Sequence, residues 1–148
     1  MPDFTKSVID ANIVIPKLIP TLQTPLALKL WEKFQSEHIS LHAPRLWIYE
    51  FTSTVQKYLA AGQISEPENE KAVKTAFGMD IGFVEDSVEL SISATKWATR
   101  LKQLVAYDGF YLAVAEQLDA PFWTADKRLA NNVRQLGVNW VYWMGDLE

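Results

Sequence analysis

Short apolar runs alternate along the chain with longer segments in which apolar residues recur every three or four positions. A short apolar run is typical of a buried strand, and the three-to-four spacing is typical of an amphipathic helix. The runs predict strands at 7–9, 38–42, 81–84, 122–124 and 138–143, with at most a short extended piece at 104–105. The longer segments predict helices at 13–18, 25–35, 44–59, 66–78, 87–100, 110–118 and 127–137.

Residues that favour helix starts support several of these boundaries. Thr24 stands before Pro25, which is a favoured first helical residue. Asp108 and Asp126 stand where N-caps belong, before the last two helices. Strands that alternate with helices in this way form crossover units. We therefore predict one α/β domain over residues 1–148, with three layers (α/β/α) and a mostly parallel central sheet.

The composition narrows the class of protein. The chain has 148 residues, 49% of them apolar, which suits one domain with a sizeable core. It has no cysteine, which excludes disulfides and thiolate metal sites and favours a reducing, cytoplasmic location. No apolar run approaches the roughly 18 residues that span a bilayer, so we expect no membrane association. The net charge of −4 argues against tight, non-specific binding to duplex nucleic acid, but not against local phosphate binding.

Four carboxylates stand out by their positions in this pattern. Asp10 ends an apolar strand, and Asp126 lies two residues beyond the end of another. Asp108 begins a helix, and Glu50 falls at the margin of an apolar helical stripe that starts at Trp47. In open α/β sheets, binding sites form beyond the carboxyl ends of the strands, so chemistry is expected at these positions.

Each acid also has a purely structural interpretation, since Asp108 and Asp126 could be ordinary N-caps. Asp10 could be a turn residue, and Glu50 could pair with Lys57. Four carboxylates at one sheet edge cannot all stay ionised without cations between them, so the set favours a metal site. Mg²⁺ and Mn²⁺ prefer such oxygen ligands. A bound ion of this kind activates water and neutralises charge on a phosphodiester, which favours a hydrolase.

Four segments carry recognisable motifs. They are VIDAN at 8–12, APRLWIYE at 43–50, YDGFYLAVAE at 107–116 and APFWTADKRL at 120–129. In order, and at ordinary spacing over nearly the whole chain, these segments resemble the motifs of the PIN-domain family. The group that they resemble most is the VapC-like toxin ribonucleases of bacterial and archaeal toxin–antitoxin pairs.

The resemblance implies a Mg²⁺- or Mn²⁺-dependent endoribonuclease that hydrolyses phosphodiesters of single-stranded RNA. It also implies a homodimer and inhibition by a small antitoxin protein. The family's catalytic acids match Asp10, Glu50, Asp108 and Asp126. Asp10 and Asp108 match the acids most directly tied to the metal, and we expect Asp126 to join them in holding one or two ions. The family's auxiliary polar positions match Asn12 and Thr124. The chain departs from the family pattern at Gly109, where alanine is usual, and this change predicts a weaker first helical turn.

Basic residues just beyond the last acid offer a place for RNA phosphates. Lys127, Arg128 and Arg134 follow Asp126 in the predicted helix. Lys and Arg side chains commonly contact the phosphates of nucleic acids. An ordinary solvated helix face is the alternative interpretation of the same residues.

Two other functions fit part of the pattern. A non-catalytic PIN-like module would bind RNA or a protein, and the loss of two acids would have favoured it. A phosphotransfer receiver or a small phosphatase would also use Mg²⁺, but it would leave Glu50 without a role. The intact set of acids therefore favours the ribonuclease.

Overall fold

A computed structural model describes residues 2–147 of the chain. Within these residues five strands form one parallel sheet: β1 (Lys6–Ile9), β2 (Ser40–Pro44), β3 (Gly82–Val84), β4 (Phe122–Thr124) and β5 (Val141–Trp143). The spatial order of the strands is β3-β2-β1-β4-β5. The helices are α1 (Ile15–Leu18), α2 (Thr24–Ser36), α3 (Leu46–Ala60), α4 (Glu66–Phe77), α5 (Val88–Arg100), α6 (Tyr107–Leu118) and α7 (Lys127–Arg134), with 3-10 turns η1 (Ala11–Ile13) and η2 (Met144–Asp146).

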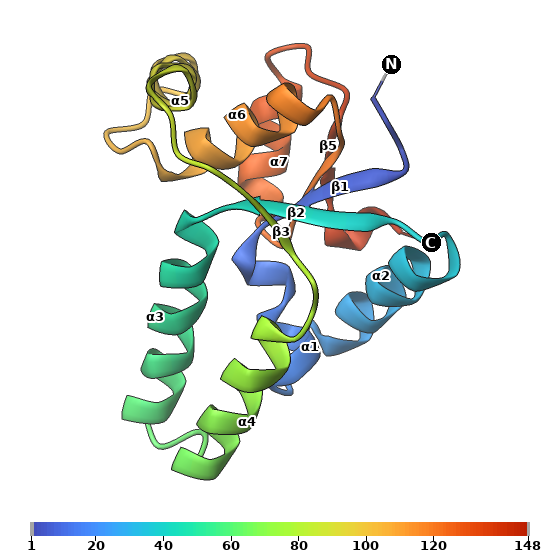
Figure 1. The fold of residues 1–148 in the computed structure, drawn as a ribbon, viewed down its shortest axis with the longest axis vertical. Helices are drawn as coiled ribbons and strands as arrows, with labels where there is room; N and C mark the ends of the chain where they lie inside the picture. The colour runs from blue at the N-terminus through green and yellow to red at the C-terminus, as the bar shows by residue number, and fades with distance from the viewer. Residues whose placement is uncertain (1, 148) are drawn as a thin grey trace.

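The helices cover both faces of the sheet. From β1 the chain moves outward through β2 to β3, and α1 to α4 lie on one side of the sheet (Figure 1). From β3 the chain returns to the other flank of β1, and α5 to α7 lie on the opposite side. The reversal places β1 and β4 side by side at the centre of the sheet. The predicted three-layer fold with a parallel sheet is confirmed.

Alternation of side chains along β4 shows how both faces are buried. The ring of Phe122 stacks on Tyr111 of α6, with ring centroids 5.6 Å apart. The next side chain, Trp123, points to the other face and meets Phe34 of α2 edge-on at 6.3 Å. Because successive strand residues face opposite sides, two adjacent apolar residues of one short strand serve two layers of helices.

The second strand begins and ends later than the predicted 38–42. His38 has a positive φ of 53°, so it belongs to the turn after α2, and β2 runs on to Pro44. Proline has no N–H to donate to a sheet ladder, and Pro44 is the last residue of β2. The sequence had predicted that the following helix begins at Pro44, but it begins at Leu46.

Other boundaries also differ from the prediction. The last strand starts at Val141 and not at residue 138, because α7 ends at Arg134 and Gly137, with φ 87°, turns the chain. No strand forms at 104–105, where both side chains are exposed. Helix α2 begins at Thr24 itself, whose hydroxyl group donates a hydrogen bond to the Pro16 carbonyl oxygen.

The boundary that matters most for function is the start of α6. This helix begins at Tyr107 with Ala106 as its N-cap, so Asp108 lies inside the first turn. The prediction of Asp108 as an N-cap is therefore wrong, and its carboxylate is not used to cap the helix. Asp126, in contrast, does cap α7 by accepting a hydrogen bond from the Leu129 N–H at 3.0 Å.

Among residues 2–147, no helix is long and apolar enough to cross a membrane.

Gly109 is required by the close packing of α6 on α5. A Cβ atom added at this position would lie 2.9 Å from the Ala94 carbonyl carbon and closer still to the carbonyl oxygen. The obstacle is backbone, which cannot rotate away as a side chain would. The weaker helix propensity of glycine, about 0.5–1 kcal/mol, is thus offset by a contact that alanine could not make.

Replacing Gly109 by alanine should therefore destabilise the fold, although alanine is the better helix former. We expect Gly109→Ala to lower the free energy of unfolding by about 1–3 kcal/mol, the usual cost of overpacking. Gly78→Ala is the matched control, because Gly78 has φ −83° and its added Cβ would stay 3.4 Å from the nearest atom. Urea unfolding measures both changes, and an unchanged or higher stability for Gly109→Ala would contradict the packing argument.

Candidate active site

The candidate site lies beyond the carboxyl ends of β1 and β4, where the order of the sheet reverses. Asp10 directly follows β1, and Asp126 lies two residues after β4. Glu50 comes from the second turn of α3, which starts just after β2, and Asp108 comes from the first turn of α6. A crevice at such a reversal is the usual binding site of open α/β sheets.

The Thr124 hydroxyl group joins the two central strand ends. It donates a hydrogen bond to the Asp10 carboxylate at 3.0 Å. It accepts hydrogen bonds from the Asn12 side-chain amide at 3.2 Å and from the Asp126 N–H at 3.0 Å. Asn12 completes the link by accepting a hydrogen bond from the Ala125 N–H at 2.9 Å. The two residues predicted as auxiliary polar positions thus hold the loops that carry Asp10 and Asp126.

Asp10 is the most buried of the four acids, with 7% of its surface exposed. Burial, followed by the charge of Glu50, raises the pKa of the Asp10 carboxyl group to about 7. Hydrogen bonds from the Asn12 N–H and the Thr124 hydroxyl group act in the opposite direction, and the charge of Asp108 adds to the increase. At neutral pH this group is therefore poised between its two protonation states.

Glu50 is held by a residue that the sequence reasoning did not assign to the site. Tyr111 of α6 donates its phenolic hydrogen to the Glu50 carboxylate at 2.6 Å. Burial raises the pKa of Glu50, the hydrogen bond from Tyr111 lowers it, and the charge of Asp108 raises it. A buried tyrosine hydroxyl needs a polar partner, so the apolar environment predicted for α6 is the signal that could have identified Tyr111.

Asp108 has a comparable support in Gln103, which lies in the loop before α6. The Gln103 side-chain amide donates to the Asp108 carboxylate at 2.9 Å. Burial raises the pKa of Asp108, this hydrogen bond lowers it, and the charge of Asp126 raises it. No periodicity or motif marks Gln103, because its role depends on a contact between the loop and the first turn of α6.

The donor set suits a hard divalent cation. All four side chains provide oxygen ligands. Besides burial, the charge of a neighbouring acid raises the pKa of three of them: Glu50 and Asp108 act on Asp10, Asp108 acts on Glu50, and Asp126 acts on Asp108. A cation among them would relieve this repulsion. In the part of the chain that the structure describes, however, no three Asp, Glu or His side chains are placed so that they could hold a metal ion together. Each carboxylate instead accepts a hydrogen bond from the protein.

The three basic residues predicted to contact RNA differ in their environments. Lys127 directly follows Asp126 in the chain, and its ammonium group lies 4.8 Å from the centre of the Trp143 ring. Arg128 is exposed on the first turn of α7. Arg134 is already engaged, because its guanidinium group donates to the Val141 carbonyl oxygen and pairs with Asp146. Lys127 and Arg128 are therefore better placed than Arg134 to meet a phosphate.

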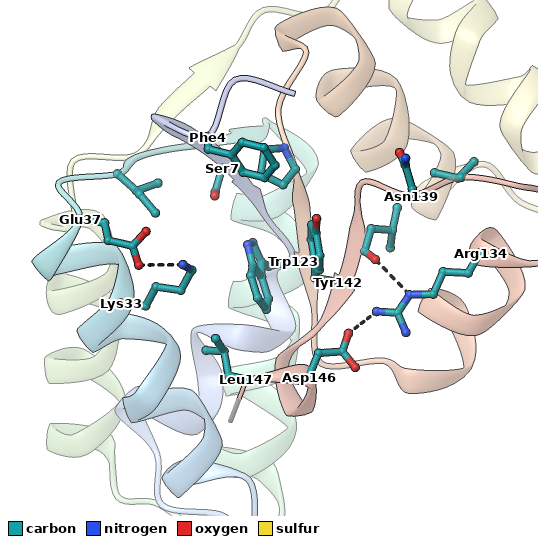
Figure 2. Close-up of a pocket in the computed structure, with 14 residues that line it drawn as sticks. Phe4, Ser7, Lys33, Glu37, Trp123, Arg134, Asn139, Tyr142, Asp146 and Leu147 are labelled. Carbon is teal, nitrogen blue, oxygen red and sulfur yellow. Dashed lines mark hydrogen bonds and ion pairs between the residues drawn. The ribbon is translucent and has the colours of Figure 1, made fainter. Parts of the chain in front are cut away.

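A separate cavity of about 670 Å³ contains none of the four acids (Figure 2). Trp123 and Tyr142 stack in it, with ring centroids 5.0 Å apart. Its charged residues are paired with each other, Lys33 with Glu37 and Arg134 with Asp146. This cavity therefore presents no unpaired cation to a phosphate, and the candidate site remains at the sheet edge.

The raised pKa of Asp10 makes a specific prediction about stability. A carboxyl group whose pKa is higher in the folded state binds its proton more tightly there, so stability falls as pH rises from about 4 to about 7. We expect the ionisation of Asp10 to lower the free energy of unfolding of the metal-free protein by about 4 kcal/mol over that pH range. Urea unfolding at pH 5 and pH 8 should therefore show a smaller loss of stability for Asp10→Asn than for the wild type. Equal losses in the two proteins would contradict the assignment.

Comparisons with known proteins agree with the fold and with the motif positions. The PIN domain model matches residues 8–139, a range that contains all four acids. No curated protein matches the chain significantly.

Several solved structures share the fold. PAE2754 from Pyrobaculum aerophilum is similar with a TM-score of 0.70 and 18% identity, covering 96% of this chain and 91% of that one. A toxin–antitoxin complex from Klebsiella pneumoniae is similar with a TM-score of 0.64 and 17% identity, covering 92% and 95%. VapBC2 from Rickettsia felis, bound to a DNA fragment from its promoter, is similar with a TM-score of 0.66 and 10% identity, covering 93% and 98%. These likenesses concern the fold, whereas the family model covers most of the sequence, and the chain therefore belongs to the PIN-domain family.

Proposed function

We propose that this PIN domain is a divalent-metal-dependent endoribonuclease that hydrolyses phosphodiesters of single-stranded RNA. The observation that carries the proposal is the electrostatic coupling of Asp10, Glu50, Asp108 and Asp126 at one edge of the sheet. Coupled carboxylates destabilise an apo protein, and such strained sites are characteristic of function. The membership of the PIN-domain family supports the same conclusion.

Asp10, Asp108 and Asp126 are the residues that would hold Mg²⁺ or Mn²⁺, with Glu50 contributing directly or through water. When bound, the ion lowers the pKa of water and offsets negative charge on the phosphodiester. The protein's own part is to aim these carboxylates. Thr124 and Asn12 orient Asp10, and Tyr111 and Gln103 fix Glu50 and Asp108 by single hydrogen bonds.

The substrate strand needs cations as well as acids around it. Lys127, which follows Asp126 in the chain and is held over the Trp143 ring, is suited to bind a phosphate near the proposed catalytic edge. Arg128, exposed on the same turn, is suited to bind the next phosphate along the strand. With a net charge of −4, the protein would repel an extended duplex more than a short single strand that meets these cations locally.

We also propose that the chain acts as the toxin of a toxin–antitoxin pair in the cytoplasm. The similar structure from Klebsiella pneumoniae is a toxin–antitoxin complex, which supports a small antitoxin as partner. A homodimer is proposed on the resemblance to VapC-like toxins alone.

The alternative is a PIN-like module that binds RNA or protein without catalysis. One observation favours it: no three acidic side chains in residues 2–147 stand as a ligand set. The two functions differ in whether the acids bind metal, so one substitution separates them.

That substitution is Asp108→Asn, which keeps the side-chain volume and can still accept the hydrogen bond from Gln103. With one negative charge removed, the metal-free protein should be as stable as the wild type or more stable. The rise in melting temperature with millimolar Mn²⁺ should shrink, since a ligand is lost. Cleavage of a labelled pool of random single-stranded RNA should fall by orders of magnitude.

Asp80→Asn is the matched control, because Asp80 is exposed just before β3, at the opposite edge of the sheet. It should leave both the Mn²⁺ response and cleavage unchanged. If the wild type shows neither a metal response nor cleavage, the non-catalytic module is the better description. If Asp108→Asn keeps both, the role assigned to Asp108 is wrong.

A further inference from the structure

A groove of about 310 Å³ opens beside Glu50, between the exposed side of α3 and the start of α6. Tyr49, Glu50, Thr54 and Lys57 of α3 line it, and Tyr107 of α6 faces them. Since Glu50 belongs to both the groove and the acidic site, a ligand in the groove would lie directly next to the candidate catalytic edge.

The two tyrosines of the groove are unusual in their exposure. Tyr49 is 67% exposed and Tyr107 is 55% exposed, whereas Tyr111 is only 1% exposed. The chain has five tyrosines, and the other two, Tyr58 and Tyr142, are half-buried. A single exposed aromatic ring is ordinary on a protein surface. Two exposed rings that line one groove beside an acidic site form a surface with a specific chemical character.

The polar groups of the groove complement a nucleotide. Lys57 forms no ion pair with any residue in the range 2–147, so its ammonium group is free to meet a phosphate. In particular, Glu50 bonds to Tyr111 and leaves Lys57 unpaired. The Thr54 hydroxyl group, one helical turn from Glu50, can bond to a base edge or to a ribose hydroxyl group.

We propose that this groove is the subsite for an unpaired nucleotide that flanks the scissile phosphodiester. Its base stacks on Tyr49 and Tyr107, and its phosphate lies at Lys57. The inference rests on the proposed function and adds to it the path of the substrate strand, which leaves the acids along α3. Aromatic stacking requires an unpaired base, so the subsite also explains why a single strand would be preferred over a duplex.

An RNA occupant suits the groove better than a protein segment. The volume is near the lower end of small-molecule pockets, which suits one nucleotide rather than a helix or strand. Rings beside a free ammonium group match the alternation of flat bases and phosphates along a single strand. A protein segment docking here is the alternative, and it predicts that the tyrosines do not affect RNA binding.

The test measures binding rather than cleavage, so that it does not depend on the chemistry. Fluorescence anisotropy with a labelled single-stranded RNA, in EDTA, compares the wild type with Tyr49→Ala and Tyr107→Ala. We expect each alanine variant to bind between about 5-fold and about 150-fold more weakly, as stacking energies imply. Tyr49→Phe and Tyr107→Phe keep the ring and should bind like the wild type. Phe77→Ala is the control, because Phe77 is 54% exposed at the end of α4 and does not line the groove.

Two further ligands and one further variant identify what the tyrosines bind. An abasic ribose-phosphate strand of equal length should bind the wild type weakly and should not respond to the tyrosine substitutions. The tyrosine substitutions should not change the affinity for a duplex of the same sequence either. Lys57→Gln should reduce the salt dependence of binding by about 0.7 in the log–log slope, as expected for one phosphate contact.

These outcomes are distinct from those that test catalysis. If Tyr49→Ala and Tyr107→Ala bind single-stranded RNA as tightly as the wild type, or if the wild type binds none, the subsite is wrong. If the protein binds RNA through the tyrosines but shows no metal-dependent cleavage, the proposed ribonuclease function is wrong and the proposed subsite stands. Because both tyrosines are exposed, unchanged melting temperatures should show that the variants are folded.

Discussion

One buried hydroxyl group holds the candidate site together. The Thr124 side chain is fully buried, and it uses its single donor and both acceptor positions at the point where β1 and β4 end. Without it, the Asp10 carboxylate would lose one of its two donors, and the turn into α7 would lose a contact to the loop after β1. The reversal of the sheet brings the strand ends together, and this hydroxyl group fixes how the acids that follow them are aimed.

The acids are arranged at a cost to the fold. Burial and mutual repulsion raise the pKa of Asp10, Glu50 and Asp108 together, so at neutral pH the site opposes folding. Tyr111 and Gln103 lower that cost through hydrogen bonds that favour the charged forms. Tyr111 of α6 thus supports an acid presented by α3, in the other half of the protein, whereas Gln103 supports Asp108 of α6 itself.

The sequence was sufficient for the fold class and for the placement of Asp10 and Asp126 beyond strand ends, for identifiable reasons. Strand-length apolar runs and helical spacing predict the layers, and the ends of β1 and β4 are marked by Asp10 and Thr124. Boundaries were less accurate where tertiary contacts decide them, as at Pro44, which ends β2 instead of opening α3. The supporting residues were missed because Tyr111 looks like core in a helical pattern and Gln103 lies in a loop without periodicity. The catalytic and metal-binding roles of the acids stay predictions.

The contact between Gly109 and the Ala94 backbone has a consequence for sequence comparison within the family. The size of the residue that follows Asp108 limits how closely α5 and α6 can approach each other. A relative with alanine at this position must hold its α5 farther from α6, so the aromatic packing of Trp97 against Trp140 would need different partners there. The size of one side chain at this position should therefore covary with the residues that fill the space between α5 and the sheet.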